Sequence, residues 1–345
     1  MGISIKEFIE SITSNRRLQE VLAGNNALYA GIPDKSPLYV HALVLNSYIE
    51  SSWKCVDGGS QIGKYLAKNI RENGGEIIRH CEVKEIVETD GRISHVVLAD
   101  GSQIHAKEFI SNIHPAKTLE MTNSKVIRSV YRKRVSTLEN TISSFTINIV
   151  LKKDSFKYFK TNYYYHGKDS VWYGWNYNEE NWPMGYALFL SASSKSEEYA
   201  DALTVLTYMR FEDVQPWADT FNTVSVTNDR GETYEEFKKR KAEKIIDLVA
   251  EKFVGLKDCI QSYYTATPLS YRDYIGNDDG SLYGILKDYN NPMQSLISPQ
   301  TKIPNLHLTG QNMVLHGILG VSISALNTCA AFMNVDELVE NIRNA

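Results

Sequence analysis

The chain has 345 residues, of which 43% are hydrophobic and 23% charged, and these proportions exclude a disordered, collagen-like or coiled-coil protein. The formal net charge of −4 gives no surplus of Lys and Arg to neutralise phosphates, which disfavours a nucleic-acid-binding protein. Tyrosine occurs 21 times, and its amphipathic ring suits the lining of an apolar site.

The four cysteines show no C-x-x-C pair and no metal-ligand spacing, so we expect neither a zinc site nor a disulfide framework. The first residues contain no apolar segment typical of a secretory signal, and no stretch approaches the ~18 apolar residues of a transmembrane helix. These features predict a cytoplasmic protein.

Hydrophobic periodicity predicts helices over residues 4–22, 38–49 and 60–72, the second of them buried. The dipeptides Asp90-Gly91 and Asp100-Gly101 are turn signals between short strands. We expect strands at 76–80, 83–88, 93–98, 102–105 and 108–112. Those between 83 and 105 form an antiparallel meander, and 77–80 lies beside 108–111.

The middle of the chain alternates with a period of two, which is typical of half-buried strands. We expect the strands of a separate antiparallel sheet at 143–151, 162–165, 171–177, 186–191 and 202–211. An amphipathic helix is predicted over 234–253, a short strand over 306–308, and one long apolar helix from Gly317 towards Ile342.

Two nucleotide-binding motifs can be set aside. Residues 58–64 fit G-x-x-x-x-G-K, but Tyr65 follows where a phosphate-binding loop needs Ser or Thr to hold magnesium, so a glycine turn that opens a helix is the better interpretation. The dinucleotide fingerprint G-x-G-x-x-G does not occur. The eight histidines are scattered, and His114 and His316, although each is in a loop beside Pro or Gly, point to no catalytic group.

The C-terminal part is more informative, because the strand at 306–308 leads into a glycine turn at Gly310 and Gly317 opens the last helix. A helix N-terminus offers unpaired N–H groups and a positive dipole to a carbonyl or anionic ring edge. Glycine at its mouth allows a ligand to approach the backbone closely, although close packing would also explain it.

Together, several ordered motifs resemble the phytoene desaturase and retinol saturase-like family of FAD-dependent oxidoreductases. They are Asp57-Gly58-Gly59, Gly74-Gly75-Glu76-Ile77, Ile110-Ser111-Asn112 before His114-Pro115, residues 267–274, residues 280–284, Leu308-Thr309-Gly310-Gln311 and residues 316–321. The matches cover most of residues 55–330.

The resemblance implies an α/β (α+β) fold with two parts. An incomplete FAD-binding domain of the glutathione-reductase-like type would comprise residues 56–115 and 300–345. A substrate domain with an antiparallel sheet and helices would comprise 1–55 and 116–299.

The implied activity is oxidation or reduction of carbon–carbon bonds in an apolar isoprenoid such as a carotenoid or retinoid, with FAD as cofactor. Contacts with the adenosine side would come from Val83, Ser111 and Asn112, and those with the pyrophosphate or ribityl chain from Gly310 and Gln311. Contacts with the isoalloxazine would come from Gly317, Ile318, Gly320 and Val321. No catalytic residue and no metal ligand is implied.

The chain departs from this family because members begin with a strand, a G-x-G-x-x-G turn and a helix that bind the ADP half of FAD. We therefore expect a truncated form, or a partner chain that supplies this segment, with FAD absent from the chain alone. The expected ligand is an apolar small molecule, which could bring the protein to a membrane surface. A cofactor-free lipid-binding or scaffold protein that keeps only the substrate domain is the alternative.

Overall fold

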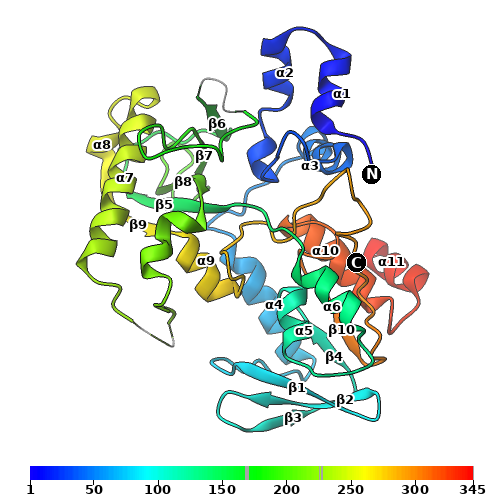
Figure 1. The fold of residues 1–345 in the computed structure, drawn as a ribbon. Helices are drawn as coiled ribbons and strands as arrows, with labels where there is room; N and C mark the ends of the chain where they lie inside the picture. The colour runs from blue at the N-terminus through cyan, green and yellow to red at the C-terminus, as the bar shows by residue number, and fades with distance from the viewer. Residues whose placement is uncertain (168–170, 225, 227, 345) are drawn as a thin grey trace.

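In the residues that the structure describes, the fold contains three β-sheets and three hydrophobic core clusters. Figure 1 shows the arrangement of its helices and strands in a computed structural model. The model describes residues 1–167, 171–224, 226 and 228–344. Its mixed α/β character agrees with the predicted fold class. Among the described residues, no helix combines the length and apolar character needed to cross a membrane.

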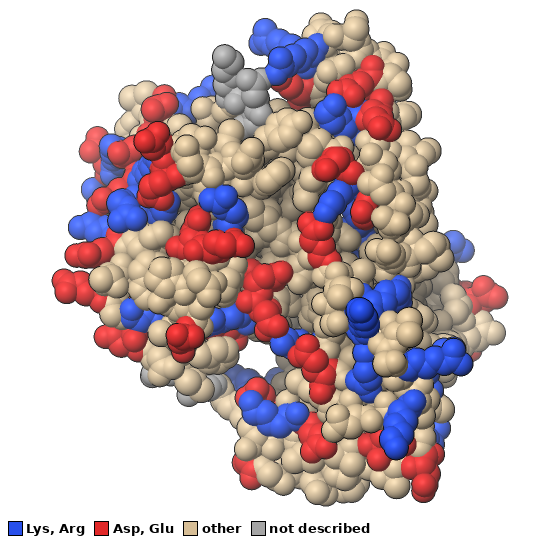
Figure 2. Space-filling view, in the orientation of Figure 1, with Lys and Arg blue, Asp and Glu red and all other residues tan. Residues whose placement is uncertain are grey.

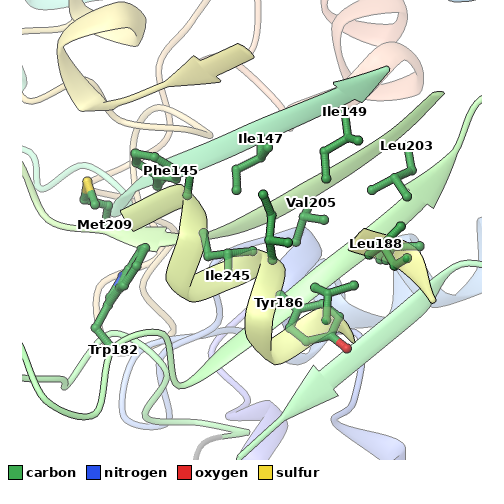
Figure 3. Close-up of a cluster of buried hydrophobic side chains, with 14 of the residues drawn as sticks. Phe145, Ile147, Ile149, Trp182, Tyr186, Leu188, Leu203, Val205, Met209 and Ile245 are labelled. Atoms are coloured by element: carbon green, nitrogen blue, oxygen red, sulfur yellow. The ribbon is translucent and has the colours of Figure 1, made fainter. Parts of the chain in front are cut away.

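The largest sheet has five antiparallel strands in the order β6-β7-β8-β5-β9, which confirms the separate antiparallel sheet predicted for the middle of the chain. Its strands are β5 (Ser143–Leu151), β6 (Tyr163–His166), β7 (Gly185–Leu190), β8 (Ala202–Met209) and β9 (Ile260–Ala266). Alternate residues of β5 and β8 point to one face, where α7 (Glu232–Lys252) covers them. Figure 3 shows Ile147, Val205 and Ile245 pointing towards one another in this core.

The predicted meander is confirmed as a three-stranded sheet of β1 (Val83–Thr89), β2 (Arg92–Leu98) and β3 (Gln103–His105). Asp90 and Gly91 both have positive φ, at 51° and 80°, as a two-residue hairpin turn requires.

The third sheet pairs β4 (Phe109–Ser111) with β10 (Leu306–Leu308) in parallel. The prediction that 77–80 lies beside 108–111 is wrong, because β4 pairs with β10 and residues 76–80 form no strand. A strand exists only where a neighbour pairs with its backbone, and this segment is largely exposed, with Ile78 at 57%.

The helices before the meander are α1 (Ile5–Ile12), α2 (Arg16–Leu22), the 3-10 turn η1 (Asn26–Leu28), α3 (Leu38–Glu50) and α4 (Ser60–Glu72). The side chain of Asn15 caps α2 and so divides the single helical segment predicted at the start. The prediction of a buried helix at 38–49 holds for the helix and is wrong for its burial, because only Val40 and His41 are buried.

The helices of the rest of the chain are α5 (Pro115–Glu120), α6 (Ser129–Ser136), η2 (Phe211–Trp217), α8 (Leu256–Cys259), α9 (Pro268–Ile275), α10 (Gly317–Cys329) and α11 (Val335–Asn344). The single helix predicted from Gly317 is therefore two, because the Asn334 side chain accepts from the amides of Asp336 and Glu337 and starts a new helix. The strand predicted at 171–177 is also wrong. These residues form turns, in which the Trp175 indole donates to the Trp172 carbonyl.

A second core cluster joins the meander to the two-stranded sheet. Its buried residues are Ile86, Ile93, Leu119, Ile127, Val135, Ile285, Ile297, Ile303, Leu306, Leu308 and Met313. The cluster includes residues on both sides of positions 115 and 300, where we place the boundaries between the two domains. The division into a cofactor part and a substrate part stays a prediction.

Candidate functional site

The site is built at the carboxyl ends of the parallel strands β4 and β10. Ser111 pairs with Leu308, and the Thr309 amide donates to the Ser111 carbonyl at 2.9 Å. Gly310 then turns the chain with φ +99°, and a Cβ at this position would lie only 2.1 Å from Oδ1 of Asn112. The structure thus brings together three predicted cofactor residues at the carboxyl ends of two parallel strands, which is the place where open parallel sheets bind ligands.

Two hydrogen bonds hold α10 against these strand ends. The Gly310 amide donates to Oγ of Ser324 at 3.0 Å, and Oγ1 of Thr328 donates to the Leu308 carbonyl at 3.0 Å. A Cβ on Gly320 would lie 2.3 Å from the Leu315 carbonyl oxygen, so the first turn of the helix packs directly on the loop that precedes it. The first two contacts hold the second half of α10 against the strand ends, and the third holds its first turn against the preceding loop.

The N-terminus of α10 is open. His316 is the N-cap residue, and its side chain makes no capping hydrogen bond. Gly317 has φ +76°, and a Cβ there would meet no atom within 4 Å. Ile318, at 65%, and Val321 are exposed. The free N–H groups of the first turn are therefore accessible to a ligand with carbonyl or anionic groups.

Val83, which is also predicted to contact FAD, lies in the meander and not at the ends of β4 and β10. Its backbone pairs with Leu98 in the meander, whereas its side chain packs against the second core cluster, which also contains Leu306 and Leu308. The meander and the strand ends are thus connected through a shared core.

Gln311 lines a small cavity of about 20 Å³ beside the N-terminus of α10. The volume is enough for a single water molecule. Polar groups surround it, namely Tyr29, Ser36, Thr141, Tyr283, Lys287 and His316.

Two nitrogen bases that line this cavity have lowered pKa values. Burial lowers the pKa of Lys287 to about 8, and its ammonium group donates to the carbonyls of Ser295 at 3.3 Å and Asn312 at 3.4 Å. Burial, with a smaller effect of the Lys287 charge, lowers the pKa of His316 to about 4. His316 is therefore neutral at pH 7, and its buried Nε2 has no hydrogen-bond partner among the described residues.

An aromatic cluster extends from His316 towards the five-stranded sheet. The Tyr283 ring stacks on His316 with 4.1 Å between ring centroids, and its hydroxyl donates to the Ala27 carbonyl. The hydroxyls of Tyr48 on α3 and Tyr164 on β6 lie 3.4 Å apart. Burial raises the pKa of Tyr164, and the nearby Tyr283 contributes to the increase.

Beside this cluster, a groove of about 830 Å³ is formed by α2, α3 and β6. Apolar and aromatic side chains form much of its wall, including Val21, Leu22, Leu45, Tyr164, Tyr165 and Val171. Its size and lining suit an apolar small molecule.

Sequence reasoning predicted Ser111, Asn112, Gly310 and the start of α10. It included Tyr283 in the motif at 280–284 without giving it a role, set His316 aside and missed Lys287. A lone Lys in an irregular segment gives no signal that distant residues will surround it. For His316, the adjacent Gly317 was the available signal.

Comparison with known proteins provides independent information on this arrangement. No protein-family model matches the chain. The chain is 24% identical over 354 residues to the all-trans-retinol 13,14-reductase of Danio rerio, a match that covers 96% of this chain. It is also 24% identical over 361 residues to the all-trans-retinol 13,14-reductase of Homo sapiens, and that match covers 99% of this chain. A prolycopene isomerase from Daucus carota is 26% identical over 279 residues. This chain is homologous to the all-trans-retinol 13,14-reductases.

The resemblance inferred from the motifs is thereby confirmed. The chain spans 58% of the length of the Danio rerio reductase, 59% of the Homo sapiens protein and 42% of the isomerase.

Solved structures show the same mixed α/β fold. An oxidoreductase from Methanosarcina mazei superposes with a TM-score of 0.57 at 15% identity, and a putrescine oxidase variant with a TM-score of 0.59 at 9% identity. This chain covers 68% of each of these structures. At such identities the likeness establishes the fold alone.

Proposed function

We propose that the chain is part of an FAD-dependent oxidoreductase that oxidises or reduces a carbon–carbon bond of an apolar isoprenoid, such as a retinoid or carotenoid. The observation that carries the proposal is the open N-terminus of α10, a helix that is held against the ends of β4 and β10 and that has aromatic residues between it and an apolar groove. The retinol reductases and the prolycopene isomerase support the substrate class by their names.

The residues at the strand ends fit the ribityl and ring portions of FAD. Gly317 offers backbone with open space above it, and the first turn of α10 has N–H groups that no capping side chain satisfies. Asn112 would lie along the adenosine side and Gly310 along the pyrophosphate or ribityl chain, and Gly317 and Gly320 would place the helix dipole against the ring. When bound, FAD supplies the exchange of an electron pair with the substrate.

The chain's own residues would exclude water and orient the substrate. Tyr283, stacked on neutral His316, would shield the N-terminus of α10 from water. The groove at α2, α3 and β6 would hold the apolar ligand. We assign no residue to proton transfer.

The proposal also assigns cofactor binding and substrate binding to different segments of the chain. Residues 56–115 and 300–345 would form part of the FAD-binding domain, and 1–55 with 116–299 the substrate domain. The ADP half of FAD would be held by further polypeptide, because no G-x-G-x-x-G turn occurs in these 345 residues. We propose a cytoplasmic protein that meets its apolar ligand at a membrane surface.

FAD titration of the purified chain, followed by quenching of flavin fluorescence, tests the cofactor assignment. We expect weak binding that Gly317→Leu reduces at least about tenfold, because the new side chain fills the space above the first turn of α10. Gly255→Leu is the matched control, since Gly255 also has positive φ, at 87°, and open space around it.

Equal FAD affinity in wild type and Gly317→Leu would overturn the site. A chain that binds all-trans-retinol but no FAD, alone or with a relative's glycine-rich segment added, would instead support a cofactor-free lipid-binding or scaffold protein.

A further inference from the structure

The outer face of the meander carries a pair of histidines that are separated in the sequence and adjacent in space. His95 on β2 pairs directly with His105 on β3, and their ring centroids lie 4.9 Å apart with 34° between the ring planes. The neighbouring Val96 packs against the second core cluster, so alternation along β2 points the His95 side chain to the opposite face. Residues directly opposite on antiparallel strands share a face, and both imidazoles therefore lie on the solvent side.

A β-bulge places a hydroxyl group beside the His95 ring. The register of the β1–β2 pair shifts after Val87, which pairs with His95, and Ser94 is the extra residue at this shift. The Ser94 hydroxyl donates to the Val87 carbonyl at 3.2 Å, and its oxygen lies 2.9 Å from Nδ1 of His95.

These two hydrogen bonds assign the tautomer of His95. The hydroxyl of Ser94 has a single proton, which is used in the bond to Val87, so Nδ1 of His95 is the donor in the other bond. A neutral imidazole protonated at Nδ1 has its free lone pair on Nε2. Histidines that bind metal ions are typically held in this way, with the second ring N–H donated to a fixed group. The His95 ring therefore already has the tautomer and the support of a metal ligand.

We propose that His95 and His105 form a binding site for a divalent transition-metal ion that prefers imidazole, such as Zn²⁺ or Ni²⁺, and that Ser94 positions His95. Imidazole nitrogen favours these ions over Mg²⁺ and Ca²⁺, which prefer oxygen ligands. The absence of a cysteine motif argues against a structural zinc site, and this site uses no cysteine.

The spacing of the two rings suits a shared ion. Tetrahedral zinc with Zn–N bonds of about 2.0–2.1 Å needs its two nitrogens about 3.3 Å apart. The rings reach this distance from a centroid separation of 4.9 Å by rotation about χ2, which is a soft torsion in histidine. Among the residues that the structure describes, no group of three or more His, Cys, Asp or Glu side chains converges, so water would complete the coordination.

The ion would fasten the edge of the meander. β3 is the edge strand of this sheet, and all three of its residues are exposed. On the face seen in Figure 2, acidic and basic side chains are interspersed over the meander at the lower end of the molecule, so selectivity has to come from the ligands and not from a patch of one charge. The site requires no flavin and so goes beyond the proposed function.

Calorimetric titration of the full chain with ZnCl₂, without FAD, tests the site. We expect one Zn²⁺ per chain, no binding of Mg²⁺ under the same conditions, and an affinity at least about tenfold weaker in His95→Ala and His105→Ala, because a single imidazole lacks the gain from a second ligand held nearby. The matched control is His80→Asn, which removes another exposed imidazole and tolerates the φ of 58° at that position. It should bind Zn²⁺ like the wild type.

Nitrogen-15 spectra of the histidine side chains test the role of Ser94. We expect His95 to be protonated at Nδ1 before zinc is added, and Zn²⁺ to shift its Nε2 resonance and to slow hydrogen exchange at 103–105. Ser94→Ala should remove the preference for this tautomer and weaken zinc binding, whereas Ser94→Thr, which keeps the hydroxyl, should preserve both.

Equal zinc affinity in the wild type and His105→Ala would overturn the proposal, and so would a metal-free His95 protonated at Nε2. Circular dichroism of each variant shows whether it is folded. None of these readouts involves flavin, so failure here is distinguishable from failure of the proposed function.

Discussion

The geometry around Gly310 predicts how much stability the substitution Gly310→Ala would cost. In Gly310→Ala, the new Cβ lies 2.1 Å from Oδ1 and 3.3 Å from Cγ of Asn112, and the backbone keeps φ +99°. The left-handed conformation costs an L-residue about 1–2 kcal/mol, and the contact adds a similar amount because the amide must move. We expect a total loss of about 2–4 kcal/mol in the free energy of unfolding.

A double mutant separates the two contributions. In Asn112→Ala, the oxygen that opposes the new Cβ is absent, so adding Gly310→Ala should cost only the conformational part, about 1–2 kcal/mol. Gly255→Ala, at φ +87° with open space, should give the same conformational cost. Urea unfolding followed by circular dichroism measures the wild type and all four variants. Equal losses for Gly310→Ala in the presence and absence of Asn112 would refute the reasoning.

Two further predictions concern buried charges. The pKa of Lys287 is lowered on folding to about 8, so the unfolded chain binds more protons between pH 8 and about 10.4, and stability should rise with pH across that window. Lys287→Met should remove this rise, and an unchanged slope in urea-unfolding curves would contradict the assignment. The buried carboxylate of Asp273 accepts from Arg230, Arg272 and the Asn222 amide, so Asp273→Ala should cost about 3–5 kcal/mol, as measured by chemical denaturation. A loss no greater than that of Asp229→Ala, at an exposed position, would refute it.

Local patterns predicted those elements whose structure is fixed by neighbouring residues. The turn at Asp90 and Gly91 requires only positive φ at two positions, and both residues tolerate it. The alternation along 143–151 reflects the apolar face of β5, although Ser144 and Thr146 on its other face are buried as well. Ser4 caps α1 as predicted, by accepting from the Glu7 amide.

The wrong predictions concern segments whose structure depends on contacts with residues distant in the sequence. Residues 76–80 read as a strand but form none, because pairing depends on neighbours that the local sequence does not show. The apolar residues of α3 predicted burial, yet Ile49 is 74% exposed. Apolar side chains favour burial, but the local sequence does not show whether another element packs on them. The candidate site was proposed from its glycines and stays a prediction, whereas Lys287, Tyr283 and His316 meet only through tertiary folding.

The central claim, that these residues serve FAD-dependent chemistry on an isoprenoid, is tested most directly with the chain in complex with a relative's glycine-rich segment and FAD. All-trans-retinol and a carotenoid are added without oxygen, while the visible absorbance of the flavin and the mass of the isoprenoid are followed together. The account predicts either that oxidised flavin is reduced as the isoprenoid loses one pair of hydrogen atoms, or that flavin reduced beforehand with dithionite is oxidised as the isoprenoid gains one pair. A flavin-loaded complex that binds the isoprenoid but leaves both spectrum and mass unchanged would contradict it.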